Sequence, residues 1–151
     1  MLAILFVYDL KWFLLPNYVV FPLIAVGVLI TLISIFSSTD VVMTLVGVTS
    51  AVVLLSGIYL FLWFVSKGRW IGFGDIKLGL ALALILVDWQ LAFIALFAAN
   101  LIGCLVVIPG LMTHKLTRKT HVPFGPLLIL GAIVAMLAGD SIITWYFATL
   151  L

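Results

Sequence analysis

About six apolar runs separated by short polar connections make up this chain. None shows the strict alternation of apolar and polar residues that a transmembrane barrel strand requires. Each run is near the length of about 20 residues that a helix needs to cross a bilayer, or somewhat shorter. The pattern therefore predicts an all-α, polytopic membrane helical bundle. The expected segments are Met1–Leu10, Asn17–Phe36, Val41–Val65, Asp75–Val87, Gln90–Met112 and Phe124–Leu150.

The first run, Met1–Leu10, looks truncated, because it is too short to cross a bilayer. Either the helix begins upstream of Met1, or it inserts only half way. A cleaved signal peptide is a poorer interpretation, since neither a basic start nor a small-residue cleavage site is visible. Residues 1–151 have no transporter-type internal repeat and no soluble appendage, which predicts a single membrane-embedded domain.

Composition excludes several classes of protein. Of the 151 residues, 67% are hydrophobic and only 8% are charged, with a mean hydropathy of +1.49, which no soluble domain of this size resembles. The net charge of +2 is too small to indicate a nucleic-acid partner. The sequence has one cysteine, Cys104, so neither a disulfide framework nor a zinc site built from cysteines is expected.

The charges indicate how the chain is oriented in the membrane. Basic residues fall in or beside the odd-numbered connections, whereas the even-numbered connections and the tail carry only acidic ones. By the positive-inside rule, the odd connections face the cytoplasm and the N-terminus lies outside the cell membrane. Tryptophan and tyrosine flank the expected segments as an interfacial belt would. The basic residues are Lys11, Lys67, Arg69, Lys77, Lys115, Arg118 and Lys119, and the acidic ones Asp40, Asp88 and Asp140.

Asp9 and Asp75 are the best candidates for a functional site. An ionisable side chain at membrane depth costs about 2.5–3.5 kcal/mol and by default marks a functional position. Asp9 ends the first segment as it reaches the cytoplasm, and Asp75 begins the fourth as it leaves. The predicted topology therefore puts both residues at the same membrane level, although they are far apart in sequence.

Two neighbouring carboxyl groups suit the hydrolysis of an amide. Because they cannot both ionise cheaply, the pair holds one proton between them. The ionised group can take a proton from water while the protonated group polarises a peptide carbonyl. Simpler interpretations stay open. Asp75 is placed as a helix N-cap would be, and Asp9 is placed to pair with Lys11 or Lys77 at the membrane interface.

Three motifs support the first interpretation. One is Gly72–Leu78, which reads GFGDIKL, and the second is Asp9–Lys11 followed by Leu15–Asn17. The third is Val122–Leu128, which reads VPFGPLL. In this order they resemble the GxGDxKL signature, the first aspartate motif and the PFGP-type element of the type IV prepilin peptidases, which are membrane aspartic peptidases. The motifs together span nearly the whole chain.

This resemblance implies that Asp9 and Asp75 form a catalytic dyad facing the cytoplasm, without a metal or cofactor. It implies that the partners are pilin-like or pseudopilin precursors, whose short basic leader is cut just before an apolar helix. Lys77 would orient the loop or offset charge on the dyad, or would only snorkel to the interface. The other motif residues, Gly72, Gly74, Pro123, Phe124, Gly125 and Pro126, would support the site.

The two motif glycines have their own interpretation. Gly72 and Gly74 allow unusual backbone dihedrals and the close approach of a substrate strand, or form simply a flexible turn.

The larger members of the family carry an N-terminal segment with paired cysteines that bind zinc, and some also methylate the new N-terminus. This chain supplies no such cysteines and is similar to the short forms, so neither zinc nor methyl transfer is expected.

Other functions remain as alternatives. Tyr8-Asp9 with the GxGD stretch also resembles the presenilin and signal peptide peptidase group, although no Pro-Ala-Leu element is present. A small proton or cation transporter subunit would use the aspartates as a relay, and an inactive scaffold for pilus assembly would share the fold. His114 and His121 flank a basic loop and are weak metal candidates, because no carboxylate or cysteine stands at ligand spacing.

Overall fold

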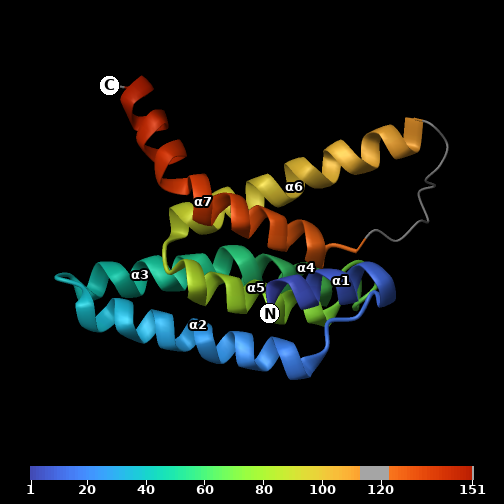
Figure 1. The fold of residues 1–151 in the computed structure, drawn as a ribbon, viewed down its shortest axis with the longest axis horizontal. Coiled ribbons are helices and arrows are strands. Elements are labelled where there is room, and N and C mark those ends of the chain that lie inside the picture. Colours follow the sequence, from blue (N-terminus) through green and yellow to red (C-terminus); the bar gives the residue numbers. More distant parts are fainter. Residues whose placement is uncertain (113–122, 151) are drawn as a thin grey trace.

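A computed structural model of the chain describes residues 1–112 and 123–150 and confirms the all-α membrane bundle (Figure 1). The π-helical turn η1 (Val53–Gly57) joins two of the helices, α3 and α4, into one continuous run. The helices are α1 (Leu2–Trp12), α2 (Asn17–Ser37), α3 (Val41–Val52), α4 (Ile58–Ser66), α5 (Phe73–Leu86), α6 (Trp89–Met112) and α7 (Gly125–Leu150).

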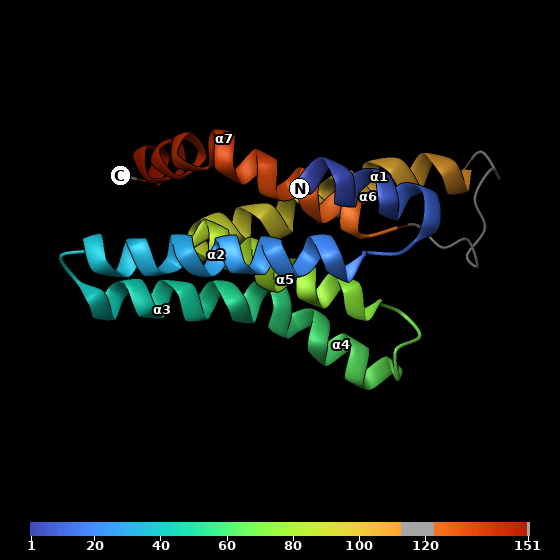
Figure 2. The same cartoon turned by 60° about the horizontal axis from the view of Figure 1, so that its bottom comes forward.

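Helix α5 runs through the middle of the bundle in both ribbon views (Figures 1 and 2). It packs against α2, α3, η1, α4, α6 and α7. Its buried side chains are small or aliphatic and lie on all sides of the helix, among them Leu78, Ala81, Leu82 and Ala83, which have no exposed surface. A helix that is apolar all round belongs inside a bundle, which explains why this short segment becomes the core element.

Small residues and buried hydroxyls hold the other helices close to α5. A Cβ atom on Gly79 would overlap the carbonyl oxygen of Leu55 in the π turn, so α5 and η1 touch backbone to backbone. The hydroxyl of Ser56 donates to the Ile76 carbonyl at 3.1 Å, and that of Thr31 donates to the Leu84 carbonyl at 2.8 Å. Close backbone contacts and interhelical hydrogen bonds of this kind bind membrane helices together.

Four helical stretches are long and apolar enough to cross a membrane: Asn17–Ser37, Val41–Ser66, Trp89–Pro109 and Gly125–Thr149. Helices α1 and α5 are shorter. The 14 residues of α5 extend about 21 Å, less than the hydrocarbon thickness of about 30 Å. The connections at residues 13–16 and 67–72 lie at one end of the bundle, and the connection at 38–40 lies at the other (Figures 1 and 2).

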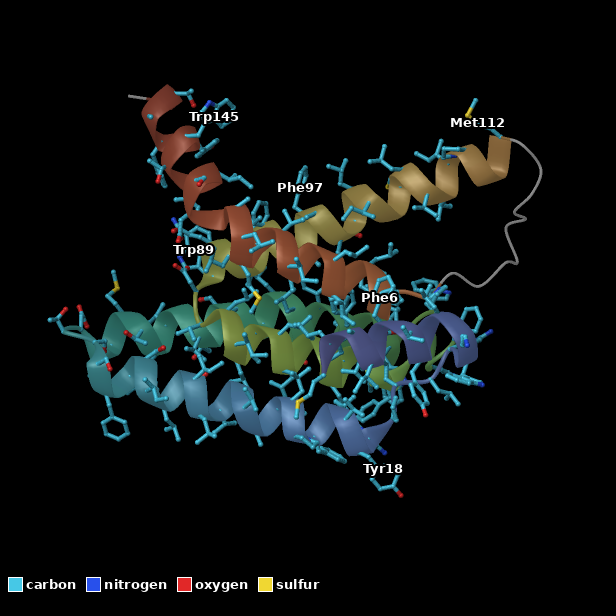
Figure 3. All side chains as sticks on the ribbon, in the orientation of Figure 1. Phe6, Tyr18, Trp89, Phe97, Met112 and Trp145 are labelled. Carbon is cyan, nitrogen blue, oxygen red and sulfur yellow. The ribbon has the colours of Figure 1, made fainter. Side chains whose placement is uncertain are left out.

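The outer surface is apolar, as a lipid-facing surface should be. Figure 3 shows Tyr18 and Met112 toward one end of the molecule and Trp89 and Trp145 toward the other, all pointing outward. Tyr18 is 93% exposed, and Trp89 and Trp145 are also exposed. This distribution fits aromatic side chains placed at two membrane interfaces.

Substitution of Gly79 by alanine tests the contact between α5 and the π turn. The added methyl group has no room beside the Leu55 carbonyl, so we expect Gly79→Ala to destabilise the bundle by about 1–3 kcal/mol, as overpacking does. Thermal unfolding in detergent micelles measures the effect. Gly57→Ala is the matched control, because its methyl group would meet only ordinary contacts at 3.7 Å or more. Equal melting temperatures for the two variants would contradict this packing.

Candidate active site

Asp9 lies in the last turns of α1, and its side chain is only 5% exposed. Leu5, one turn earlier on the same face, is fully buried, and the partner helix with which α1 packs most extensively is α7. The helix ends at Trp12, because Phe13 adopts a left-handed conformation (φ 52°) and its N–H donates to the Asp9 carbonyl oxygen at 3.0 Å. Helix α1 therefore ends about one turn after Asp9, whose side chain is buried in the bundle.

Asp75 lies in the first turn of α5, two residues after the helix begins at Phe73. The N-cap residue is Gly72, so the prediction that α5 begins at Asp75, with Asp75 as a possible N-cap, is wrong. The carboxyl group instead reaches back toward Gly72, whose backbone amide hydrogen-bonds to it. A side chain at the third helical position often satisfies a free amide in this way.

Gly125 brings the two carboxyl groups together. It is the first residue of α7, in the Pro123–Pro126 element, and it is buried. A Cβ atom on Gly125 would lie 2.6 Å from Oδ2 of Asp9 and 3.5 Å from Oδ1 of Asp75, so these two oxygens are at most about 6 Å apart. Within the described residues, α1 and α5 do not pack against each other, but α7 contacts both. The site is therefore assembled around the start of α7.

The other residues of the Pro123–Pro126 element help to hold Gly125 in this position. Pro126 is buried in the first turn of α7, where a missing N–H is harmless because no helical acceptor precedes it. Phe124 packs its ring against the ring of Tyr59, with centroids 5.1 Å apart. Pro123 is half-buried just ahead of the helix. The proline and aromatic residues thus fix where Gly125 lies.

The environment shifts both carboxyl groups toward the protonated form. Asp9 and Asp75 lie outside the four helices that are long enough to cross a membrane. Burial, and then the negative charge of Asp9, raise the pKa of Asp75 to about 6, against the opposing hydrogen bond from Gly72. Burial also raises the pKa of Asp9, which the backbone amide of Gly125 opposes. The charge state of Asp9 therefore influences the protonation of Asp75.

Neither aspartate is neutralised by a lysine. Among the described residues no ion pair involves Asp9, so its predicted pairing with Lys11 or Lys77 is wrong: the Lys11 ammonium lies over the Trp12 ring, 5.6 Å from its centroid. Lys77 Nζ donates to Asn17 Oδ1 at 2.9 Å and lies between the Phe21 and Phe73 rings. Lys77 thus ties the start of α2 to α5.

A cavity of ≈ 230 Å³ opens beside the two aspartates. One wall is the connection between α1 and α2, and the other is the start of α5. A Cβ atom on Gly74 would lie 3.1 Å from the Leu15 Cβ, so this glycine lets the connection lie close to α5. The lining residues are Asp9, Phe13, Leu14, Leu15, Asn17, Gly72, Phe73, Gly74, Asp75 and Lys77.

Neither motif glycine adopts the unusual backbone dihedrals that glycine permits. Gly72 has an ordinary extended backbone (φ −73°), and within the described residues the glycine with a positive φ is Gly68. Gly74 serves the close approach of Leu15 instead. His114 and His121 lie outside the described residues.

Tyr59 is a polar neighbour of the site that the sequence did not indicate. It lies in α4, is 5% exposed and interacts electrostatically with Asp75. A single tyrosine inside an apolar run carries no signal that separates it from an ordinary core residue. Its position became apparent only from the contact with Phe124.

This arrangement offers two carboxyl groups that share a buried site, next to a cavity reached from one end of the bundle. Such a pair can accept a proton from water with one group and donate a proton with the other. Oδ2 of Asp9 is itself buried and has no hydrogen-bond partner among the described residues. The chemistry available to the site is therefore general acid–base catalysis.

Comparison with known proteins agrees with this geometry. Residues 1–108, which contain both aspartates, match the type IV leader peptidase family. A prepilin leader peptidase/N-methyltransferase of Legionella pneumophila is 32% identical over 145 residues, covering 91% of this chain and 47% of that protein. The protein of the same name from Aeromonas hydrophila is 32% identical over 144 residues, covering 95% and 48%.

The same name is carried by a Bacillus subtilis protein that is 40% identical over 76 residues, covering 50% of this chain and 30% of that protein. The chain spans about half the length of the first two relatives, and no solved structure gives a significant match. The extent of the family match shows that this chain belongs to the type IV leader peptidase family.

Proposed function

We propose that this chain is a membrane aspartic endopeptidase that removes basic leader peptides from prepilin-like or pseudopilin-like precursors. Asp9 and Asp75 are its catalytic pair. The observation that carries the proposal is the convergence of these two carboxyl groups, from separate helices, on Gly125. Family membership and the printed names of the relatives support the reaction and the class of substrate.

The pair hydrolyses the peptide bond without a covalent intermediate. The ionised carboxylate takes a proton from a water molecule as the water oxygen bonds to the peptide carbonyl carbon. The protonated carboxyl group gives its proton to the carbonyl oxygen. The C–N bond then breaks: the leaving nitrogen takes a proton from one carboxyl group of the pair, and a hydroxyl group of the tetrahedral intermediate returns its proton to the other. The products are a new carboxyl group and a new amino terminus, and the pair again holds one proton.

We place this site on the cytoplasmic side of the cell membrane, with the N-terminus outside. Lys67 and Arg69 belong to the 67–72 connection, and Lys11 lies in the last turn of α1, just before the 13–16 connection. Both connections are at the end of the bundle where the cavity opens. The positive-inside rule assigns such connections to the cytoplasm. A basic leader would reach the cavity from that side, while the apolar helix of the precursor stays in the bilayer.

The alternatives are less well supported by the geometry. A relay for protons or cations favours carboxyl groups staggered across the membrane, whereas both groups here lie within about 6 Å of each other at Gly125. The family match favours a leader peptidase over a presenilin-type protease. An inactive scaffold would keep the same site and would fail only the cleavage assay.

Removal of either charge tests the pair. We expect Asp9→Asn and Asp75→Asn each to reduce cleavage by at least about 100-fold, because an amide cannot exchange protons as a carboxyl group does. Membranes containing the chain are incubated with a synthetic precursor that has a basic leader, and mass spectrometry identifies the new N-terminus. Asp40→Asn is the matched control, since asparagine caps a helix about as well as aspartate and Asp40 caps α3 at the opposite end. Cleavage that survives either site substitution would refute the dyad.

The pH dependence of cleavage follows from the shifted pKa values. A carboxyl group whose pKa is raised to about 6 keeps its proton below that pH and loses it above, so the singly protonated pair disappears as the pH rises. We expect the cleavage rate in membranes to fall progressively between pH 6 and pH 8, and to fall again in acid when the second carboxylate is protonated. Circular dichroism at each pH checks that the helices stay folded. A rate that increases steadily up to pH 8 would contradict the proposed protonation state.

A further inference from the structure

Tyr59 has a buried hydroxyl group that makes no hydrogen bond within the described residues. The residue is 5% exposed, and its hydroxyl oxygen has no hydrogen-bond partner among the described residues. A buried, unpaired hydroxyl group is unfavourable, and phenylalanine would fill the same space without it. A tyrosine in such a position suggests that its hydroxyl group finds a hydrogen-bond acceptor during the reaction.

The ring of Tyr59 is held at the edge of the proposed site. It packs against Phe124, with ring centroids 5.1 Å apart, and the next residue, Gly125, contacts both carboxyl groups. The cavity beside the dyad is lined by the α1–α2 connection and the start of α5, and not by Tyr59. Tyr59 is therefore buried in the bundle and does not line the cavity that a substrate would enter.

Asp75 is the acceptor that we consider. The negative charge of Asp75 interacts electrostatically with Tyr59. Oδ2 of Asp75 faces Gly72, at 3.4 Å from the position of a Cβ there, and the Gly72 amide hydrogen-bonds to this carboxyl group. Oδ1 lies 3.5 Å from the position of a Cβ on Gly125, the residue that follows Phe124, and the Phe124 ring packs on Tyr59. One carboxylate oxygen is thus left for a second donor.

We propose that Tyr59 is a positioning residue of the dyad, whose hydroxyl group donates a hydrogen bond to Oδ1 of Asp75 when that carboxyl group is ionised. Hydrogen bonds at catalytic groups are often long in the unliganded state and tighten as charge develops. The inference rests on the proposed peptidase function. Within it, Tyr59 and the Gly72 amide hold the Asp75 carboxylate from two sides.

Such a donor favours the ionised form of Asp75 and limits how far burial and Asp9 raise its pKa. Few other charged groups face this carboxyl group in the described chain. Asp9 comes from α1, and Lys77 borders the same cavity but is bound to Asn17. Helix α3 and the π turn carry no charged residue, Tyr18 of α2 is exposed, and Asp140 lies toward the far end of α7.

Removal of the single oxygen atom in Tyr59→Phe tests the proposal. The ring and its packing on Phe124 remain, so we expect an unchanged or higher melting temperature. The titration of Asp75, followed by its infrared carboxyl band and assigned with Asp75→Asn, should move to higher pH by about one unit. The limb of the cleavage profile above pH 6 should move with it. Tyr18→Phe is the matched control, since Tyr18 is 93% exposed.

An unmoved titration of Asp75 would overturn the proposal, and so would an equal shift in Tyr18→Phe. A clear fall in the melting temperature of Tyr59→Phe would assign the hydroxyl group a structural role instead and would also overturn it. The infrared titration does not depend on cleavage. If the wild-type chain cuts no precursor but the titration shifts, the peptidase function fails while the hydrogen bond stands.

Discussion

The two carboxyl groups meet because the backbone of α7 can pass beside both of them at Gly125. Oδ2 of Asp9 lies 2.6 Å from the position that a Cβ would take, which is closer than a real side chain allows. A larger residue there would force the Asp9 carboxyl group to move. Since α1 and α5 do not pack against each other within the described chain, the missing side chain at Gly125 is what makes a shared site possible.

The remaining contacts determine which aspartate is firmly held. Asp75 belongs to the central helix, which is bound to the π turn through Gly79 and through the Ser56 hydroxyl group, and to α2 through Thr31. Asp9 belongs to a short helix whose main contact is with α7. The α1–α2 connection adds a second restraint, because Leu15 lies against Gly74 and Asn17 is bound to Lys77. Asp75 is therefore held by the central helix and its contacts, whereas Asp9 is positioned by α7 and this connection.

Much of this architecture follows from the sequence. Continuous apolar runs predict the helices, and the alternation of basic and acidic connections predicts that Asp9 and Asp75 reach the same end of the bundle, where the structure has them. The motif residues Lys77 and Asn17 prove to be hydrogen-bonded to each other. The helices and the shared end of the two aspartates depend on composition, local periodicity and the placement of charges, which a single sequence displays directly.

Other features depend on contacts between distant segments. The start of α5 was predicted two residues late, because the extended Gly72 takes the N-cap position and lets Asp75 reach back to it. Nothing in the run Val41–Val65 indicates a π turn, which lies where Leu55 comes into close contact with Gly79 of α5. Tyr59 could not be distinguished from a core residue, since only packing on Phe124 brings it to the site.

The central claim is that Asp9 and Asp75 act as one unit. A double-mutant cycle measures this most directly: the cleavage rates of Asp9→Asn, Asp75→Asn and the doubly substituted chain are compared with that of the wild type. The account predicts that the double variant is no slower than either single variant, because groups that act together lose their effect together. Losses that multiply in the double variant would show two independent contributions and would contradict a shared site.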